Sequence, residues 1–251
     1  MTAVIPPPRP ATGLPPALLL TRVENGERLH GLLWRVGERR RMISSAVLGG
    51  GTGERAWVLN AQVSHGYRRT DPDRHLADLA RDAGAHGPGV GLMTAADVRE
   101  YGHAHDGGVD AVATAGLGVR GWAASPAQGT ALAEGPGTVN ILVALPVALT
   151  DAALVNAVAT ATEAKVQALL DAGYDCSGTP TDAVCVAALS PRPGDEVHAF
   201  AGPRSLWGAR LARAVHQAVG AAAGVGRCAG AAAGTRGSTG RTSRSGPSRA
   251  G

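Results

Sequence analysis

The stretch ISSAVLGGGTGERAWVLNAQV, residues 43–63, holds four glycines in the five positions 49–53, between two apolar runs. A phosphate-binding loop of the Gly-x-x-x-x-Gly-Lys-Ser/Thr type needs a lysine after its last glycine, and none follows here. A dinucleotide-binding loop must open a helix, whereas Trp57 and Val58 begin a run that is typical of a strand. The pattern therefore predicts two strands and a glycine turn, whose bare backbone lets another segment or a ligand approach closely.

Similar patterns extend this prediction along the chain. Alternating or continuous apolar runs predict strands at 29–37, 42–48, 56–63, 90–94, 109–114, 138–145 and 182–189. Capping residues ahead of periodic segments predict three helices: one that opens at Asp71-Pro72, one from Thr150 to about residue 172 closed by Gly173, and one over 205–219. Strands gather early and helices fall between the later ones. We therefore predict an α+β fold, a single domain with a mixed, largely antiparallel sheet and packed helices.

Composition divides the chain into three parts. Residues 1–16 are a proline-rich leader that we expect to be disordered, residues 17–226 form the domain, and residues 227–251 are an Arg/Gly/Ser-rich tail with the same expectation. The pI near 9.4 comes from that tail. Removing its five arginines from the 24 basic residues leaves 19 against 20 acidic ones. With aromatics at 3%, the body lacks stacking platforms, so we expect no nucleic-acid partner for it.

The sequence also argues against a membrane-spanning protein and against a secreted protein. No apolar run approaches the roughly 18 residues that a membrane-spanning helix needs, and the start does not read as a secretory signal. The cysteines, Cys176, Cys185 and Cys228, are odd in number and lack metal-ligand spacing. Buried or idle thiols of a cytoplasmic protein fit this pattern.

Lys165 is the one lysine in a chain with 23 arginines. Helical spacing places it on the apolar arc of the 150–172 segment with Leu154, Val155, Val158, Thr162 and Leu169, whereas Glu163 and Thr160 share the more polar side. An inward-facing lysine can act as a base, an acid or an oxyanion clamp. A lysine at the rim that extends to water is the equally weighted alternative.

Several strand ends carry hydroxyl or amide side chains beside small residues. Thr94 and Thr114 end predicted strands, Thr138 and Asn140 begin one, and Thr179, Thr181 and Asp182 precede another. Such groups suit an active-site edge, although the last segment also suits an ordinary turn. Gly137-Thr138 further allows a self-cleaving threonine hydrolase.

His103 and His105 could ligate a metal from one strand face. No third ligand with convincing spacing accompanies them, so we favour surface histidines and predict no metal site.

These segments together resemble the adenosylcobinamide amidohydrolase family of corrinoid salvage. The matching pieces span about residues 42–220 and occur in the family's order: Ser44–Gly51, Asn60 in Asn-Ala-Gln-Val, Leu92–Ala96, Ala113–Leu117, Gly137–Ile141, Ala161–Lys165 and Thr179–Ala183. One departure is Pro180, where the family usually has a small residue. Proline removes a backbone donor at that position.

The resemblance implies hydrolysis of the amide that joins a propionate side chain of the corrin ring to aminopropanol, giving adenosylcobyric acid. The corrinoid is then a small-molecule substrate, and no cofactor is expected. A non-catalytic corrinoid-binding protein for sensing or delivery is the alternative. Adenosylcobinamide carries no phosphate on its aminopropanol, so the glycine turn need not grip one.

Amide hydrolysis needs an activated nucleophile, an oxyanion donor and an acid for the departing amine. We expect Lys165 to face the site with Asp182 as its carboxylate partner, and Thr181 and Glu163 to complete the catalytic set. A threonine that acts as a covalent nucleophile is the alternative, and the sequence does not choose between the two. Glu163 lies about 160° from Lys165 around the helix, so one narrow pocket cannot hold both. For substrate binding we expect Ser45, Gly50, Gly51, Asn60, Thr94, Thr114, Thr138, Asn140 and Thr179.

Overall fold

The glycine-rich stretch joins two antiparallel strands, as the sequence predicts. The structure, a computed structural model, describes residues 13–125 and 137–224. Strand β2 (Glu27–Ser44) ends just before the turn, and β3 (Gly51–Gln62) returns alongside it with Ile43 opposite Thr52. At Gly49, φ is +68° and an added Cβ would lie 1.9 Å from the carbonyl oxygen of Gly89. The bare backbone therefore accommodates a neighbouring strand of the protein itself.

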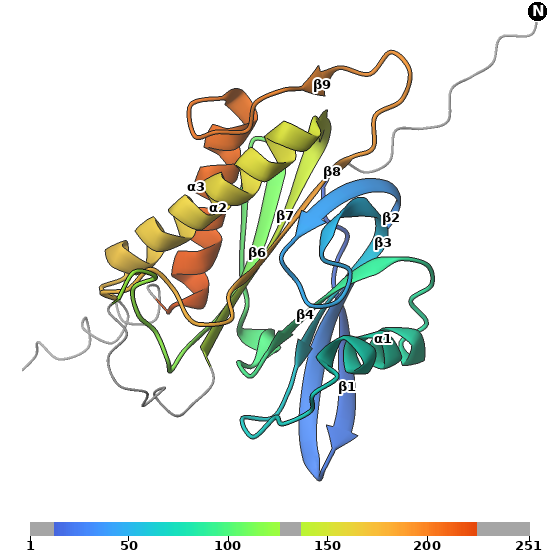
Figure 1. Cartoon of the computed structure of the whole chain (residues 1–251), viewed down its shortest axis with the longest axis vertical. Helices are drawn as coiled ribbons and strands as arrows, with labels where there is room; N and C mark the ends of the chain where they lie inside the picture. The colour runs from blue at the N-terminus through green and yellow to red at the C-terminus, as the bar shows by residue number, and fades with distance from the viewer. Residues whose placement is uncertain (1–12, 126–136, 225–251) are drawn as a thin grey trace, which may run out of the picture.

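The other elements follow in chain order around this hairpin (Figure 1). The strands are β1 (Leu18–Glu24), β4 (Gly89–Thr94), β5 (Gly102–Asp106), β6 (Val109–Leu117), β7 (Gly137–Leu149), β8 (Ala183–Leu189) and β9 (Val197–His198). The helices are α1 (Pro72–Asp82), α2 (Asp151–Asp171), α3 (Leu206–Ala222) and a 3-10 turn, η1 (Val98–Glu100).

All nine strands of the described residues form one mixed sheet. Its order is β4-β3-β2-β8-β7-β6-β5, with β1 added to β2 and β9 to β7. Most pairings are antiparallel, whereas β3–β4, β7–β8 and β7–β9 are parallel. The α+β prediction with a largely antiparallel sheet is confirmed.

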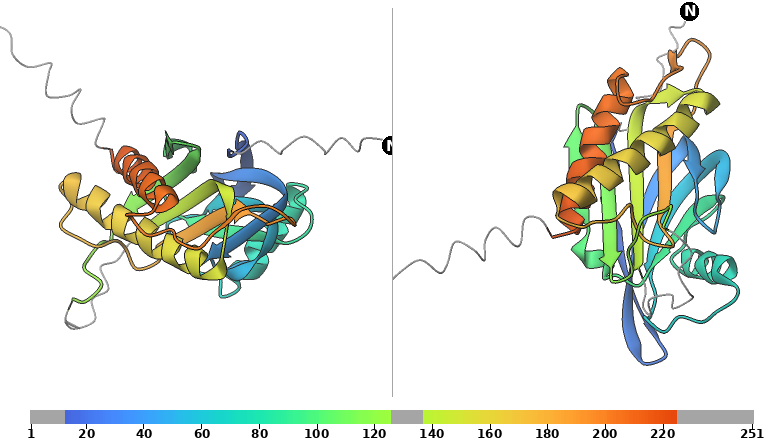
Figure 2. Two further views of the ribbon diagram at one scale, coloured as in Figure 1. Left: turned by 90° about the horizontal axis from the view of Figure 1, so that it is seen from above. Right: turned by 60° about the vertical axis from the view of Figure 1, so that its left-hand side comes forward.

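Because side chains alternate along each strand, the two faces of the sheet pack into different hydrophobic clusters. On β7, Ile141 and Val143 join the cluster under α2 and α3, whereas Leu142 joins a second cluster on the opposite face. Helices α2 and α3 pack together on the same side of the sheet (Figure 2), and α1 covers β2 and β3 through Leu76. The second cluster fills the inside of the curl, where Asn140 of β7 reaches Met93 of β4.

Several sequence expectations need correction. Residues 29–37 and 42–44 belong to one continuous strand, β2, whose pairing with β3 shifts register between Arg35 and Arg40. Residues 45–48, which were predicted as strand, lie beyond the end of β2. Strands β1, β5 and β9 were not among the predicted strands. The three helices were predicted correctly, including the Thr150 cap, whose hydroxyl accepts the Ala153 N–H.

Two cysteines lie in the described residues, and both are buried and free. Burial raises the pKa of Cys185 to about 12, so this thiol is idle, as expected. Cys228, the tail and most of the leader lie outside the described residues. No helix in the described ranges is long and apolar enough to span a membrane.

Candidate active site

A cleft of about 870 Å³ opens on the concave face of the sheet. Two walls form it. The β7–β8 wall consists of Gly137, Thr138, Asn140 and Pro180–Ala183, and the β3–β4 wall consists of residues 63–65, 67, 68 and 91–95. Residues 45–47, just after β2, line the cleft between the two walls, and Ser45 is hydrogen-bonded to Val184 of β8. Ser45, Thr94, Thr138, Asn140, Thr181 and Asp182, all predicted from the sequence, line this one cleft.

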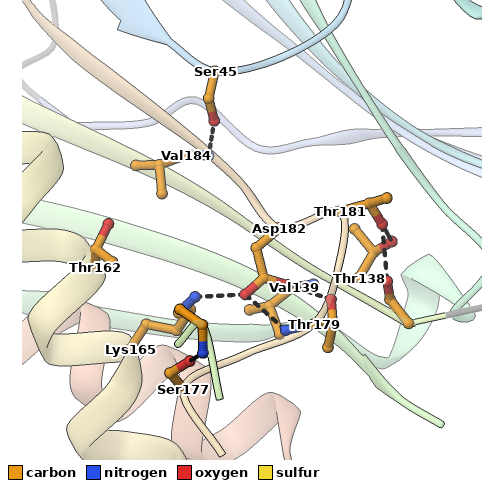
Figure 3. Close-up of polar contacts among 12 residues, drawn as sticks. Ser45, Thr138, Val139, Thr162, Lys165, Ser177, Thr179, Thr181, Asp182 and Val184 are labelled. Carbon is orange, nitrogen blue, oxygen red and sulfur yellow. Dashed lines mark hydrogen bonds and ion pairs between the residues drawn. The ribbon is translucent and has the colours of Figure 1, made fainter. Parts of the chain in front are cut away.

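Lys165 and Asp182 form an ion pair at the base of the β7–β8 wall (Figure 3). The lysine reaches from α2, and its Nζ lies 2.5 Å from Oδ2 of Asp182. Their side chains are only 9% and 13% exposed. The predicted partnership is therefore present, but Lys165 stands behind Asp182 and does not itself line the cleft.

The Asp182 carboxylate is fully engaged by donors. Oδ1 accepts the Val139 N–H at 2.8 Å and the Thr179 hydroxyl, and Oδ2 accepts the Thr179 N–H at 3.2 Å in addition to Lys165. This one carboxylate thus binds the start of β7, the turn before β8 and the ammonium group of Lys165 from α2. Each oxygen of the carboxylate therefore accepts two hydrogen bonds, which leaves no lone pair of Asp182 free.

Gly178 is required beside this pair. Its φ is +152°, and an added Cβ would lie 2.2 Å from Oδ2 of Asp182 and 2.6 Å from Nζ of Lys165. A side chain here would separate the two charges.

Two threonine hydroxyls of the cleft lining meet near Asp182 (Figure 3). Thr138 Oγ1 and Thr181 Oγ1 are 2.6 Å apart, and Thr181 Oγ1 donates to the Gly137 carbonyl at 2.9 Å. Because a carbonyl only accepts, Thr138 must donate to Thr181. The proton chain ends at a carbonyl, so neither hydroxyl has a base to activate it as a nucleophile.

Asn60, Thr114 and Asn140 form a buried network deeper in the concave face. Asn140 Nδ2 donates to Asn60 Oδ1 at 2.9 Å and to the Met93 carbonyl at 3.0 Å, and Asn60 Nδ2 donates to Thr114 Oγ1 at 3.0 Å. The Met93 carbonyl fixes the orientation of the Asn140 amide. Both of its N–H groups are therefore engaged, and its Oδ1 has no partner within the described residues.

The other predicted binding residues lie at different distances from the cleft. Ser45 lines it, and its hydroxyl accepts the Val184 N–H at 3.1 Å (Figure 3). Thr94 also lines it, with Oγ1 accepting the Ala96 N–H at 3.1 Å. Gly50 and Gly51 are exposed and lie outside the cleft lining. Thr179 also lies outside it, and its hydroxyl donates a hydrogen bond to Asp182.

Helix α2 buries a different arc from the one that the sequence predicts. Glu163 is exposed and lies outside the cleft lining, in line with its position opposite Lys165. Val155 and Thr162 are exposed as well, whereas Thr160 is buried and donates to the Ala201 carbonyl at 2.9 Å. Alanines form the packing face, so hydrophobicity alone marked the arc poorly.

Three cleft residues on the β3–β4 wall were missed from the sequence: His65, Tyr67 and Arg68. They directly follow the strand that carries Asn60, and a polar cluster after a strand end is the signal that could have identified them. Tyr67 Oη lies 3.1 Å from Nδ1 of the buried His75, and the two rings stack. Burial raises the pKa of Tyr67 and lowers that of His75.

His103 and His105 lie away from this cleft, on β5. His105 Nδ1 is 2.9 Å and His103 Nε2 3.4 Å from Oδ1 of Asp110. Within residues 13–125 and 137–224, no group of three or more His, Cys, Asp or Glu side chains is arranged to hold a metal ion.

Comparison with known proteins identifies the family of this chain. The profile of the CbiZ family, described as adenosylcobinamide amidohydrolase, matches residues 17–227. A Methanosarcina mazei protein named adenosylcobinamide amidohydrolase is 33% identical over 143 residues, which cover 57% of this chain and 67% of the relative. A Halobacterium salinarum protein of the same name is 46% identical over 85 residues, which cover 34% of this chain and 35% of the relative.

A solved structure from Pyrococcus horikoshii OT3 aligns over 82% of each chain with a TM-score of 0.45 and 11% identity, a similarity too weak to carry an argument. The family match, in contrast, covers the sheet, the helices and both walls of the cleft. The chain belongs to the adenosylcobinamide amidohydrolase family.

Proposed function

We propose that this chain hydrolyses the amide between a corrin propionate side chain and aminopropanol in adenosylcobinamide, releasing adenosylcobyric acid in cobamide salvage. Membership of the family makes the chain an amidohydrolase. The observation that carries the assignment to this cleft is convergence: segments 45–47, 91–95, 137–140 and 180–183 are far apart in sequence yet line one cavity. Each of them includes residues through which the sequence resembles the family.

The Lys165–Asp182 pair positions the site. Asp182 accepts hydrogen bonds from the Val139 N–H and from both donors of Thr179, so it fixes the first residues of β7 and β8 relative to each other. Lys165 compensates the buried carboxylate charge from behind. This arrangement keeps Thr138 and Thr181 at the cleft surface with their hydroxyls aligned.

Hydroxyl groups then supply hydrogen bonds to the substrate amide. Ser45 Oγ and Thr94 Oγ1 accept a backbone N–H each, which leaves their hydroxyl hydrogens to donate to a carbonyl oxygen or the oxyanion. Asn140 has both N–H groups engaged, so it offers an oxygen and accepts from the substrate. Glu163 takes no part in this arrangement. The cytoplasm is the compartment that we propose, because Cys176 and Cys185 are free and buried.

The test is incubation of the purified protein with adenosylcobinamide, following aminopropanol and adenosylcobyric acid by mass spectrometry. We expect both products to appear with the wild type and to fall sharply with Asp182→Asn, which excludes a contaminating amidase. A corrinoid that binds and stays intact would overturn the proposal in favour of a non-catalytic binding protein.

A further inference from the structure

The proposed hydrolysis needs a group that takes a proton from water and returns one to the departing amine. Four side chains that can carry a charge line the cleft: His65, Tyr67, Arg68 and Asp182. Whichever of them performs this step must have a lone pair that the protein has not already engaged.

Three of the four fail this requirement. Asp182 accepts four donors from Lys165, Val139 and Thr179. Tyr67 is held by the ring of buried His75, and burial raises its pKa further from neutrality. Arg68 stays protonated and has no acceptor atom.

His65 meets the requirement. It is exposed, it lines the cleft, and no hydrogen bond or ion pair engages it among the described residues. A neutral imidazole has one nitrogen that accepts a proton and one that donates, so a single ring can perform both transfers.

The backbone around His65 is fixed at both ends. The Val63 N–H donates to the Thr94 carbonyl at 2.8 Å, and the Tyr67 N–H closes a turn onto the Ser64 carbonyl at 3.1 Å. The Tyr67 ring is then secured by its contacts with His75. His65 therefore stands at the tip of a short anchored turn and shares the cleft lining with Thr94, one of the hydroxyls proposed to bind the substrate amide.

We propose that His65 is the acid–base catalyst of the reaction, an inference that rests on the proposed function. The imidazole removes a proton from water while the water oxygen bonds to the amide carbon. The resulting imidazolium then gives that proton to the amide nitrogen as the carbon–nitrogen bond breaks. The products are a carboxylic acid, which ionises, and a free amine, and the imidazole returns to its neutral form.

The charged and titratable groups that share the cleft with His65 are Tyr67 and Arg68 on its own segment and Asp182 on the opposite wall. All three remain in a His65 variant. A change in the acidic limb of the pH–rate profile upon substitution therefore reports His65.

The experiment compares wild type, His65→Ala, His65→Gln and a matched control, His86→Gln, with adenosylcobinamide as substrate. His86 is an exposed histidine on the loop between α1 and β4, outside the cleft. We expect both His65 variants to lose about 100-fold or more in kcat, the contribution typical of general acid–base catalysis, and His86→Gln to match wild type. Added imidazole should restore part of the rate of His65→Ala, and the acidic limb should vanish in His65→Gln.

Circular dichroism of each variant confirms folding before the rates are compared. A His65→Gln rate within about threefold of wild type overturns the inference, because acid–base catalysis contributes far more. A loss that imidazole does not restore assigns His65 to binding or structure and also overturns it. Absence of products with wild type itself is a different result, which rejects the proposed function.

Discussion

The two walls of the cleft are built on different principles. On the β7–β8 wall, Asp182 is engaged by four donors and the Thr138–Thr181 hydroxyls by each other and a carbonyl. On the β3–β4 wall, His65 and Arg68 are exposed at a turn. Side chains whose polar atoms are already hydrogen-bonded within the protein maintain the geometry of the cleft. Proton transfer, in contrast, needs a side chain with a lone pair that is not hydrogen-bonded. Residue types that look catalytic in a sequence can therefore be the scaffold.

The largest expected effect comes from breaking the ion pair of the β7–β8 wall. Lys165→Met leaves the largely buried Asp182 carboxylate without its cation, so the free energy of unfolding should fall by about 4 kcal/mol. Urea denaturation followed by circular dichroism measures it. The control is Glu163→Gln on the exposed side of α2, which should change stability by no more than about 0.5 kcal/mol. Equal losses in the two variants would show that the pair is not a structural element of this wall.

The next largest loss of stability is expected in the glycine turn between β2 and β3. Gly49→Ala meets the Gly89 carbonyl and a positive φ, whereas Gly51→Ala meets only a positive φ, with open space around its Cβ. We expect losses in unfolding free energy of about 3 and about 1 kcal/mol respectively. Denaturant titration of both variants measures the difference. Similar losses would mean that the close approach to β4 contributes nothing.

Removing one cleft hydroxyl should separate activity from stability. Thr181→Val deletes the acceptor of Thr138 and the donor to Gly137, so the cleft surface that positions the substrate shifts, and we expect kcat/KM to fall about 100-fold. The unfolding free energy should change by only about 1 kcal/mol. Thr162→Val, on the exposed side of α2, is the matched control for rate. An unchanged rate in Thr181→Val would remove the hydroxyl pair from the proposed site.

The smallest effect concerns the buried histidine that supports Tyr67. Burial lowers the pKa of His75 in the folded state, so below the ordinary value of 6.5 the unfolded chain takes up a proton that the folded chain does not. The unfolding free energy should therefore fall as the pH decreases through this range. Denaturation at pH 7.5 and pH 5 should show a smaller decrease in His75→Gln than in wild type. An identical decrease would mean that His75 does not stabilise the neutral-pH fold in this way.

Local sequence patterns predicted most of the fold because the signals are local. The caps at Thr150 and Ser205, the proline at position 72 and the alternation along β7 each act within a few residues. The irregular passage within β2 and the short β9 depend on what lies alongside them, so their own sequences did not reveal them.

The candidate site divides in the same way. Strand-end patterns identified the hydroxyls and Asp182, and the uniqueness of Lys165 indicated an inward-facing cation. They did not reveal that Asp182 is saturated or that the Asn140 amide presents its oxygen, because these depend on atoms contributed by β4, β7 and α2 together. His65 was missed because its own segment shows only a polar cluster after a strand end, whereas the cleft is formed together with residues of β4, β7 and β8.

The sequence by itself determined the elements, the family and the chemical types at the strand ends, since propensity, capping and alternation are properties of neighbouring residues. Only the tertiary structure decided which of those groups are engaged and which remain available. Hydrogen-bond saturation depends on partners from distant segments, and the curl of the sheet brings Met93 against Asn140 and His65 to the same cleft as Asp182.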